Sequence, residues 1–294
     1  MPELPEVETF KRQIVNYFQG MTVKTVKSSG KVKSTGKMKS TGKMNIAKND
    51  SILKDFSGDS LESVSRYGKY LIITFNSTSL IFVFHLGMSG SFKLNRTEIS
   101  VQDQLNDIFK HTHFTFEFEN GITLNFVDPR RFGSINVIHK DQLERYILSN
   151  LGPDALNRNY NAQSLRLSLN RTSSDIKTAL MNQKTVAGLG NIYANEILYA
   201  SSISPFKKSN MLNDNEIERL VDNSKLILKK AVSCRGSTLS DKGYTDLFGE
   251  HGSFQKFHRV YNKENSDCSR CNEKIQKAMI SNRSTYFCSS CQIQ

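Results

Sequence analysis

The stretch MPELPEVET, at residues 1–9, places a proline directly behind the initiator methionine and three glutamates close to it. If Met1 is removed, Pro2 offers a free secondary amine, and an N-terminal amine beside carboxylates can act as a nucleophile with its own proton carriers. The alternative is a plain helix start, because Pro5 suits a first turn, where its missing N–H costs nothing. The apolar residues that follow recur at helical spacing: Val7, Phe10, Ile14 and then Tyr17 or Phe18. Taken alone, the stretch favours the structural interpretation, although both can hold together.

Composition narrows the class of protein. A chain of 294 residues suggests about two domains. The formal charge of +12, from 40 Lys and Arg against 28 Asp and Glu, indicates a polyanionic partner, with nucleic acid first and an anionic membrane second. The sequence has neither an apolar run of about eighteen residues nor a signal-peptide pattern, so we expect a soluble cytoplasmic protein that does not enter a membrane.

A basic low-complexity segment follows the first helix. Three hexapeptides, KSSGKV, KSTGKM and KSTGKM, stand in tandem at residues 27–44, and the surrounding lysines have no acid among them. Such a segment should be solvated and should seek phosphate. We interpret it as a basic insertion that is accessory to binding and takes no part in an active site.

The first half then turns to β structure. Residues 70–75 and 80–84 are apolar runs of strand length, and an alternating run from His113 reaches an Asn120-Gly121 turn that begins a hairpin. A further short strand is expected at residues 134–138. With a helix in front of these antiparallel strands, residues 1–150 are predicted to form a β-sandwich or barrel with a helical start.

The second half is predicted to be helical, from a boundary at Gly152-Pro153 to about residue 235. Asn213 and Glu216 form a capping pattern ahead of a long apolar-periodic segment. In AGLGNIYANEILYA, at residues 187–200, glycines end one helix and Asn191 begins another. A tight glycine turn between two helices presents N–H groups at a helix start, which suits phosphate.

Four of the five cysteines are spaced C-x2-C-x16-C-x2-C near the end of the chain: Cys268, Cys271, Cys288 and Cys291. This spacing predicts one structural Zn2+ per chain, held by four thiolates with no open coordination position for chemistry. The segment between the cysteine pairs looks like a hairpin that carries Arg283. Cys234 stands apart and is interpreted as a bystander thiol.

Together these blocks resemble the formamidopyrimidine-DNA glycosylases, bacterial base-excision repair enzymes, along almost the whole chain. The matching blocks are MPELPEVET at 1–9, RYGKYL at 66–71, HLGMSGSF at 85–92, DPRRFG at 128–133, GLGNIYANE at 188–196, and VYNK followed by the four cysteines. The resemblance implies an α+β multidomain protein. Its expected parts are an N-terminal helix and antiparallel β-sandwich (1–150), a helix-two-turns-helix domain (153–235) and a β-hairpin zinc finger (250–294), with damaged double-stranded DNA between the halves of a monomer.

The resemblance also assigns the chemistry. Pro2 would attack the anomeric carbon of a flipped-out nucleotide and form an imine with the opened sugar. Glu3 would protonate the sugar ring or base with support from Glu6, Lys69 would assist β-elimination, and Arg283 would assist δ-elimination. The implied activity is removal of oxidised purines, 8-oxoguanine and formamidopyrimidines, followed by cleavage of the abasic site.

DNA-binding residues carry over in the same way. Met88, Arg130 and Phe132 match the trio that fills the space left by the flipped base. His85, His111 and Asn191, with Lys69 and Arg283, match phosphate-binding positions, and Tyr261 is a further expected contact. Asn182 stands where the family usually has an acid, and Ser173-Ser174-Asp175 where relatives are often basic. Lys177 is expected to keep part of that phosphate contact.

Two other functions remain open at this point. An endonuclease VIII-like enzyme acting on oxidised pyrimidines would share the scaffold, but that branch usually reads PEGPE and fills the void differently. A catalytically silent DNA-binding relative would keep the fold and would not need Pro2.

Overall fold

The protein is described from a computed structural model that covers residues 2–29, 52–96, 110–239 and 243–293. The chain divides into two compact units, one formed by residues 1–146 and 235–253, the other by 147–234 and 254–294. Each unit is described by itself. The tandem hexapeptides lie outside the described residues apart from their first three positions.

The first unit begins with helix α1 (Leu4–Phe18), as the apolar spacing predicts. Pro5 sits in its first turn, where no intrahelical N–H is needed. One face of the helix is completely buried, because Val7, Phe10, Ile14 and Phe18 all point into the core of the unit. The structural interpretation of residues 1–9 is therefore confirmed.

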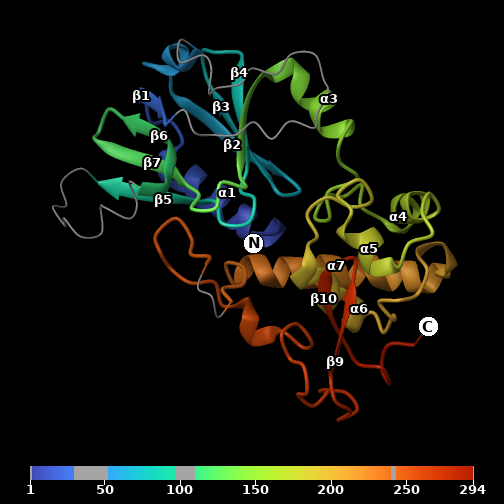
Figure 1. Cartoon of the computed structure of the whole chain (residues 1–294). Helices are drawn as coiled ribbons and strands as arrows, with labels where there is room; N and C mark the ends of the chain where they lie inside the picture. Colours follow the sequence, from blue (N-terminus) through green and yellow to red (C-terminus); the bar gives the residue numbers. More distant parts are fainter. Residues whose placement is uncertain (1, 30–51, 97–109, 240–242, 294) are drawn as a thin grey trace. The chain divides into compact units, whose positions relative to one another are not determined.

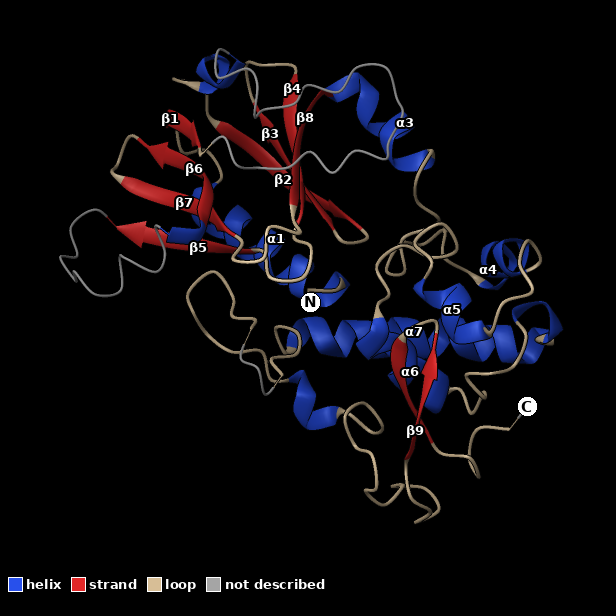
Figure 2. Cartoon of the chain, viewed as in Figure 1, coloured by secondary structure: helices blue, strands red, loops and turns tan. Residues whose placement is uncertain are grey.

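Two antiparallel four-stranded sheets complete the first unit (Figures 1 and 2). One has the order β1-β6-β7-β5, formed by Val23–Ser28, Thr112–Phe118, Ile122–Val127 and Ser91–Arg96. The other has the order β2-β3-β4-β8, formed by Leu61–Tyr67, Tyr70–Phe75, Leu80–His85 and Ser134–His139. Short 3-10 turns at Ile52–Phe56 (η2) and Lys140–Gln142 (η3) and helix α3 (Leu143–Leu148) flank them. The hairpin expected at Asn120-Gly121 joins β6 to β7 and is confirmed.

Aromatic side chains fill the space between the two sheets. Phe82 and Phe84 of β4 lie 5.1 Å and 5.8 Å, centroid to centroid, from Phe114 of β6, all in the same hydrophobic cluster. Rings at these distances in tilted or edge-to-face arrangements add to the free energy gained by burial. The two sheets thus form the antiparallel sandwich that the sequence predicts.

Residues 235–239 and 243–253 belong to the first unit, and they contact α1. Asp246 is completely buried; its carboxylate accepts a hydrogen bond from Gln13 Nε2 at 2.8 Å, and the Gln13 side-chain oxygen accepts one from Leu247 N at 3.0 Å. The ring of Tyr244 lies edge-on to Phe10 at 5.8 Å. These contacts fix the course of a segment whose path cannot be derived from its sequence.

The second unit is mainly helical. Its elements are α4 (Ala162–Leu169), α5 (Ile176–Met181), α6 (Asn191–Ala200), η4 (Ser209–Met211), α7 (Asp214–Ser233) and η5 (Phe254–Phe257). Helix α7 begins as predicted, because Asn213 Oδ1 accepts from Glu216 N and Glu216 Oε2 accepts from Asn213 N, both at 2.9 Å. Helix α6 begins at Asn191, again as predicted.

A two-stranded hairpin, β9 (Gln276–Ile280) and β10 (Arg283–Phe287), stands between the two cysteine pairs. Ser281 and Asn282 form its turn with positive φ angles of 48° and 58°, the conformation of a tight two-residue hairpin. Strand β10 packs on α6. Among the described residues, no helix is both long and apolar enough to cross a membrane.

Candidate active site and nucleic-acid contacts

The first turn of α1 buries the two acids expected to work with Pro2. Glu3 and Glu6 are each 1 % exposed, and Pro2 is buried as well. Glu6 Oε2 accepts a hydrogen bond from Glu3 N at 2.8 Å. The helix start therefore fixes the backbone of Glu3 beside Pro2 through the side chain of Glu6.

A second set of contacts holds Glu6 from the other side and was not expected from the sequence. Glu6 Oε1 accepts from Ser237 N at 2.7 Å. Gly236 has a φ of 79°, and a Cβ there would lie 2.4 Å from Glu6 Oε1. Only glycine gives the carboxylate this close approach without strain. The sequence contains one signal for this contact, the glycine in Arg235-Gly236-Ser237. Its role becomes evident only once the position of α1 beside it is known.

Burial also affects the pKa of the Tyr244 hydroxyl, which lies near Glu6. Burial, followed by the charge of Glu6, raises the pKa of Tyr244 well above its usual value. The phenol therefore stays protonated, and its hydroxyl donates to Arg235 O at 3.1 Å. This bond ties the turn that contacts Glu6 to the packed segment behind it.

Glu8 is held in a different way from Glu3 and Glu6. Its carboxylate accepts from Arg66 Nε and Arg12 Nε, both at 2.9 Å. Burial raises its pKa, but the hydrogen bond and charge of Arg66 outweigh that effect and leave the pKa below its usual value. Glu8 is an ionised structural group that links α1 to β2, which makes it a poor proton donor.

Lys69 lies in the two-residue turn between β2 and β3. Gly68 opens that turn with a φ of 56°, and its carbonyl accepts from Arg66 Nη1 at 3.1 Å. Lys69 is 7 % exposed. It is therefore a buried lysine on a tight turn, whereas most lysines lie on the surface.

His85, at the end of β4, is neutral and keeps one ring N–H for a ligand. Burial, together with the charge of Lys69, lowers its pKa to about 4. Gly87 N donates to His85 Nδ1 at 3.2 Å, so in the neutral ring the proton is on Nε2. A neutral imidazole with a fixed Nε2–H can donate to a phosphate oxygen at physiological pH.

Two loops of the first unit come together and carry the three residues expected to fill the void. A Cβ at Gly87, whose φ is 62°, would lie 2.4 Å from the carbonyl carbon of Phe132, so the loops around these residues touch through their backbones. Phe132 is 50 % exposed, with the guanidinium of Arg130 4.9 Å from its ring centroid. Met88 is half-buried in the facing loop. The structure therefore brings Met88, Arg130 and Phe132 into one region.

A buried aspartate organises these loops, and no role was predicted for it from the sequence. Asp128, 1 % exposed, accepts from Ser89 Oγ at 2.5 Å and from Gly133 N at 2.6 Å. Asp128 N in turn donates to His111 O at 3.0 Å, which places half-buried His111 beside the same loop.

In the second unit, Lys177 differs from what the sequence suggests. Its side chain is 0 % exposed, and its Nζ donates to Ser284 O and Thr285 Oγ1, both at 2.8 Å. These bonds join α5 to β10. The placement favours a structural role for Lys177, and its contact with DNA stays a prediction.

Asn191 starts α6 and also reaches the hairpin, since its Nδ2 donates to Ser284 O at 3.1 Å. Its Oδ1 is the one buried side-chain N or O atom without a hydrogen-bond partner in the described part of the chain. Such an atom costs roughly 1–3 kcal/mol and calls for an explanation, which at a helix start includes a ligand site.

Glu196 and Asn195 of the same helix hold the C-terminal segment, and the sequence analysis gave neither a role. Glu196 accepts hydrogen bonds from the backbone N–H groups of Arg259, Val260 and Tyr261 at 2.8–3.0 Å. Burial raises its pKa in spite of these three bonds. Asn195 Oδ1 accepts from Tyr286 N at 2.8 Å. The GNIYANE block thus holds the four-cysteine segment through hydrogen bonds, and it places half-buried Tyr261.

Arg283 is exposed at the start of β10, directly after the hairpin turn. No hydrogen bond or ion pair of its guanidinium is recorded among the described residues. Its position leaves a planar cation available to a ligand, as the sequence predicts.

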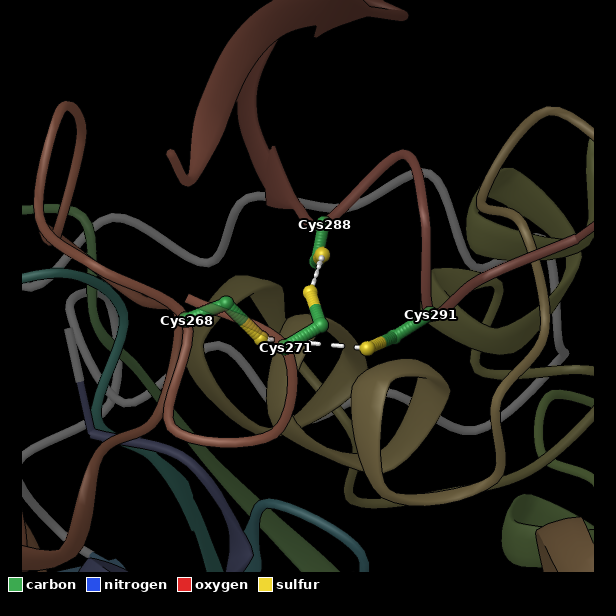
Figure 3. Close-up of side chains that lie close together, drawn as sticks. All are labelled: Cys268, Cys271, Cys288 and Cys291. Carbon is green, nitrogen blue, oxygen red and sulfur yellow. Dashed lines mark hydrogen bonds between the residues drawn. The ribbon is translucent and has the colours of Figure 1, made fainter. Parts of the chain in front are cut away.

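The four cysteines of the second unit converge on one point (Figure 3). All four Sγ atoms lie within 4.8 Å of one another, with Cys271 to Cys288 at 3.4 Å and Cys268 to Cys291 at 3.8 Å. A tetrahedral site with metal–sulfur bonds of about 2.3 Å has sulfurs roughly 3.8 Å apart. The donor set and its spacing therefore fit a metal ion. Cys234, at the end of α7, is not part of the cluster.

Comparison with known proteins identifies the chain. The family model for the formamidopyrimidine-DNA glycosylase N-terminal domain matches residues 1–135, and the model for the H2TH domain of the same enzymes matches residues 151–243. Formamidopyrimidine-DNA glycosylases of Zymomonas mobilis and Bacillus subtilis are 38 % and 34 % identical to it, with 99 % of this chain covered in both, and 100 % and 99 % of the relatives.

Solved structures agree with these sequence matches. A complex of Lactococcus lactis Fpg with DNA containing an abasic site superimposes with a TM-score of 0.85 at 31 % identity, over 100 % of both chains. A complex of the same protein with DNA containing N7-benzyl-Fapy-dG gives the same values. These matches define a base-excision repair DNA glycosylase. Within that class, the chain belongs to the formamidopyrimidine-DNA glycosylase family, and the resemblance found in the sequence is confirmed.

Proposed function

We propose that the protein removes oxidised purines, 8-oxoguanine and formamidopyrimidines, from duplex DNA and then cleaves the abasic site by β,δ-elimination. The observation that carries this proposal is the buried first turn of α1, in which Glu6 fixes Glu3 directly behind Pro2. The neighbouring structures, solved with abasic-site and Fapy-dG DNA, support the substrate class. We place the enzyme in the bacterial cytoplasm as a monomer, in keeping with its bacterial relatives.

Pro2 is the proposed nucleophile once Met1 has been removed. Its nitrogen lone pair attacks C1′ of the flipped nucleotide, and the electrons of the C1′–N bond leave with the base, which takes a proton. An α-amino group titrates near 7.7–8.0 and a lysine near 10.4, so at pH 7 far more of the terminus than of a lysine is unprotonated. The attached nitrogen then loses its N–H proton, the C1′–O4′ bond breaks as O4′ takes up a proton, and the nitrogen lone pair completes a positively charged iminium with C1′.

Glu3 is the proposed proton donor to the sugar ring oxygen or the base, with Glu6 as a positioning residue. The contacts from Glu3 N and Ser237 N to the two oxygens of Glu6 support this division of roles, because they fix its carboxylate in one orientation. Glu6 then orients Glu3 for proton transfer.

Lys69 and Arg283 are the proposed helpers of the two elimination steps. The first step removes a proton from C2′ and expels the 3′ phosphate; the second removes a proton from C4′ and expels the 5′ phosphate. A fixed ammonium at Lys69 and an exposed guanidinium at Arg283 can each stabilise the departing phosphate charge. Hydrolysis of the remaining iminium returns free Pro2.

The DNA contacts are proposed from the same geometry. Met88, Arg130 and Phe132 fill the space left by the flipped base, and the exposed ring of Phe132 suits insertion between base pairs. His85 donates its Nε2–H to a phosphate. His111, Lys177, Asn191 and Tyr261 complete the proposed set.

We infer that the four-cysteine cluster holds one Zn2+, bound by Cys268, Cys271, Cys288 and Cys291. Four thiolates close the coordination shell, so the ion would stabilise the fold of the hairpin segment and leave chemistry to other residues. Domain limits of 1–150, 153–235 and 250–294 remain our proposal for the units of function.

Borohydride trapping tests the proposed chemistry. Protein lacking Met1 should form a covalent adduct with a duplex containing 8-oxoguanine, because reduction captures the iminium. A matched protein with one alanine added ahead of Pro2 should bind the duplex and form no adduct. Absence of an adduct from correctly processed protein would show a catalytically silent DNA-binding relative, and preference for oxidised pyrimidines would show endonuclease VIII-like action.

Glu3→Gln separates the two chemical steps. Base release from 8-oxoguanine should fall by at least 100-fold, while trapping on a preformed abasic site should persist, because no base has to leave there. Equal loss on both substrates would mean that Glu3 acts only by holding Pro2 in place.

A further inference from the structure

A cavity in the second unit has no part in the proposed chemistry. It has a volume of about 470 Å3 and lies where the end of α6, the middle of α7, η5 and the first cysteine pair meet. Known ligand sites occupy about 300–1,000 Å3, so this space can take one or two large side chains.

The cavity wall is apolar and partly open to solvent. Leu226 and Ile227 of α7 face Phe254 and Phe257 of η5 across it. Leu226 is 68 % exposed and Phe257 is 43 % exposed, whereas Phe254 is buried. Single exposed apolar residues are ordinary, but two of them at the mouth of one cavity form a surface that a partner can cover.

Three cations surround this apolar wall. Lys230 lies 4.7 Å above the ring of Phe257, and Arg259 is exposed beside it. Arg270 is fixed in position, because its guanidinium donates to Tyr199 O and Ala200 O at the end of α6 and lies 4.3 Å from the centroid of the Tyr199 ring.

The cavity lining contains one acidic residue, Glu196. Its carboxylate accepts hydrogen bonds from the backbone N–H groups of residues 259–261, so these bonds, and not the cations of the lining, orient it. Lys225 and Lys229 add positive charge to the C-terminal half of α7, and Lys256 adds it to η5. The acids of α7 all lie in its N-terminal half: Asp214, Glu216, Glu218 and Asp222. The complementary ligand is therefore apolar in its centre and negative at its edges.

Nucleic acid fits this cavity poorly. The proposed phosphate contact of α6 is at its first residue, Asn191, while the cavity lies at its last two, Tyr199 and Ala200. At 1.5 Å per residue the two ends of this helix are about 13 Å apart. A phosphate backbone is bound by cations and N–H groups and gains nothing from an open apolar wall.

We propose that this cavity is a docking site for an acidic peptide segment of a partner protein that carries one or two large apolar side chains. The apolar side chains occupy the space between α7 and η5, and the carboxylates of the peptide pair with Lys230, Arg259 and Arg270. A small interface of this kind is typical of weak, transient encounters.

Fluorescence polarisation with the full-length, zinc-loaded protein tests the proposal. The probe is a fluorescein-labelled peptide, Glu-Asp-Asp-Leu-Phe-Glu, and we expect a Kd on the order of tens of micromolar, as for a small transient interface. A peptide with Leu and Phe replaced by Ser, and one with its acids replaced by amides, should each bind at least 10-fold more weakly. No measurable binding of the probe, or equal binding of all three peptides, overturns the proposal.

Matched variants locate the site. Lys230→Glu should weaken binding of the probe by at least 10-fold. Lys229→Glu makes the same charge change one residue away on α7 and outside the cavity, and it should change the affinity by less than 3-fold. Leu226→Gln should weaken binding of the probe, and Leu167→Gln should not. Leu167 is also an exposed leucine, on α4 and outside the cavity. Trapping activity and zinc content should be unchanged in all four variants.

A competition experiment with undamaged duplex DNA tests whether the cavity binds nucleic acid and not a peptide. It should not displace the peptide at low ratios, and Lys230→Glu and Lys229→Glu should lower duplex affinity equally. If duplex DNA competes with the probe and Lys230→Glu alone weakens duplex binding, the cavity belongs to the nucleic-acid surface and the docking proposal is wrong.

Discussion

The first turn of α1 and the four-cysteine segment both hold polar groups in fixed positions, but they do so by different means. Glu3 and Glu6 lie over a large core of aromatic side chains from two sheets, and backbone N–H groups fix Glu6. The cysteine segment has a small cluster of its own, in which Val260, Ile275 and Tyr286 pack with Cys268 and Cys288. A small core cannot by itself offset the entropy of ordering a chain. The comparison teaches that packing stabilises the first region, whereas the second depends on the metal ion that we propose for its four cysteines.

Removing one thiolate tests this difference most severely. Cys288→Ser should release the metal and unfold the hairpin segment, because binding of a structural zinc ion contributes about 10–16 kcal/mol in small zinc modules. Hydrogen exchange should show lost protection in β9 and β10 while the sandwich strands stay protected. Duplex affinity should fall by at least 100-fold.

Cys234→Ser is the matched control, because Cys234 lies outside the cluster. Its zinc content, exchange pattern and duplex affinity should equal those of the parent protein. A Cys288→Ser protein that keeps its hairpin protected would show that packing alone stabilises both regions.

Gly236→Ala tests the packed region. The new methyl group would collide with Glu6 Oε1 and would force a strained φ, so the free energy of unfolding should fall by about 2–4 kcal/mol. The rate of base release should fall at least 10-fold, because Glu6 must move. Gly249→Ala provides the control: its φ is 85°, nothing lies within 4 Å of the added Cβ, and only the backbone strain of about 1 kcal/mol applies.

Urea unfolding and single-turnover base release together check this prediction. If Gly236→Ala and Gly249→Ala lose the same stability and keep the same rate, the contact between Gly236 and Glu6 does not position the acid.

Lys177→Met compares a buried lysine of the second unit with an exposed one. It removes both hydrogen bonds to β10 and should lower the free energy of unfolding by about 1–3 kcal/mol. Lys208→Met is the control, since this exposed lysine pairs only with Asp175 at 2.7 Å and such pairs contribute about 0–1 kcal/mol.

The salt dependence of duplex binding decides what Lys177 does. If its role is structural, Lys177→Met should leave the slope of log Kd against log salt unchanged, whereas Arg283→Ala should lower that slope by about 1. A lowered slope for Lys177→Met would restore the phosphate contact predicted from the sequence.

The titration of His85 tests the difference between buried and exposed charged groups without any change of sequence. Its pKa of about 4 lies below the value in the unfolded chain, near 6.5, so the unfolded state binds a proton first as the pH falls. The contribution of His85 to stability is therefore complete above pH 6.5 and is lost as the pH falls toward 4. NMR of the ring should show a midpoint near 4, with Gly87 N–H perturbed in the same range, and a midpoint between 6 and 7 would contradict the neutral donor proposed for phosphate binding.

Much of the fold follows from local sequence. The apolar spacing from Val7 to Phe18 gave α1, the Asn120-Gly121 turn gave the β6–β7 hairpin, and Asn213 with Glu216 gave the start of α7. These signals act over a few residues, so each of these elements can be predicted from its local sequence. The cysteine spacing is equally local, because each pair must supply two ligands from one turn.

The remaining features depend on residues far apart in the chain. Gly236 and Ser237 meet Glu6 across more than two hundred positions, Asp128 joins Ser89 to Gly133, and Lys177 turns inward to β10. A carboxylate or ammonium looks the same in a sequence whether solvent, a backbone N–H or a buried partner surrounds it. The sequence by itself determined the first helix, the β6–β7 hairpin, the start of α7 and the spacing of the four cysteines. Only the tertiary structure decided which charged groups are fixed inside and which remain free for DNA, because burial and hydrogen-bond partners arise when distant segments pack.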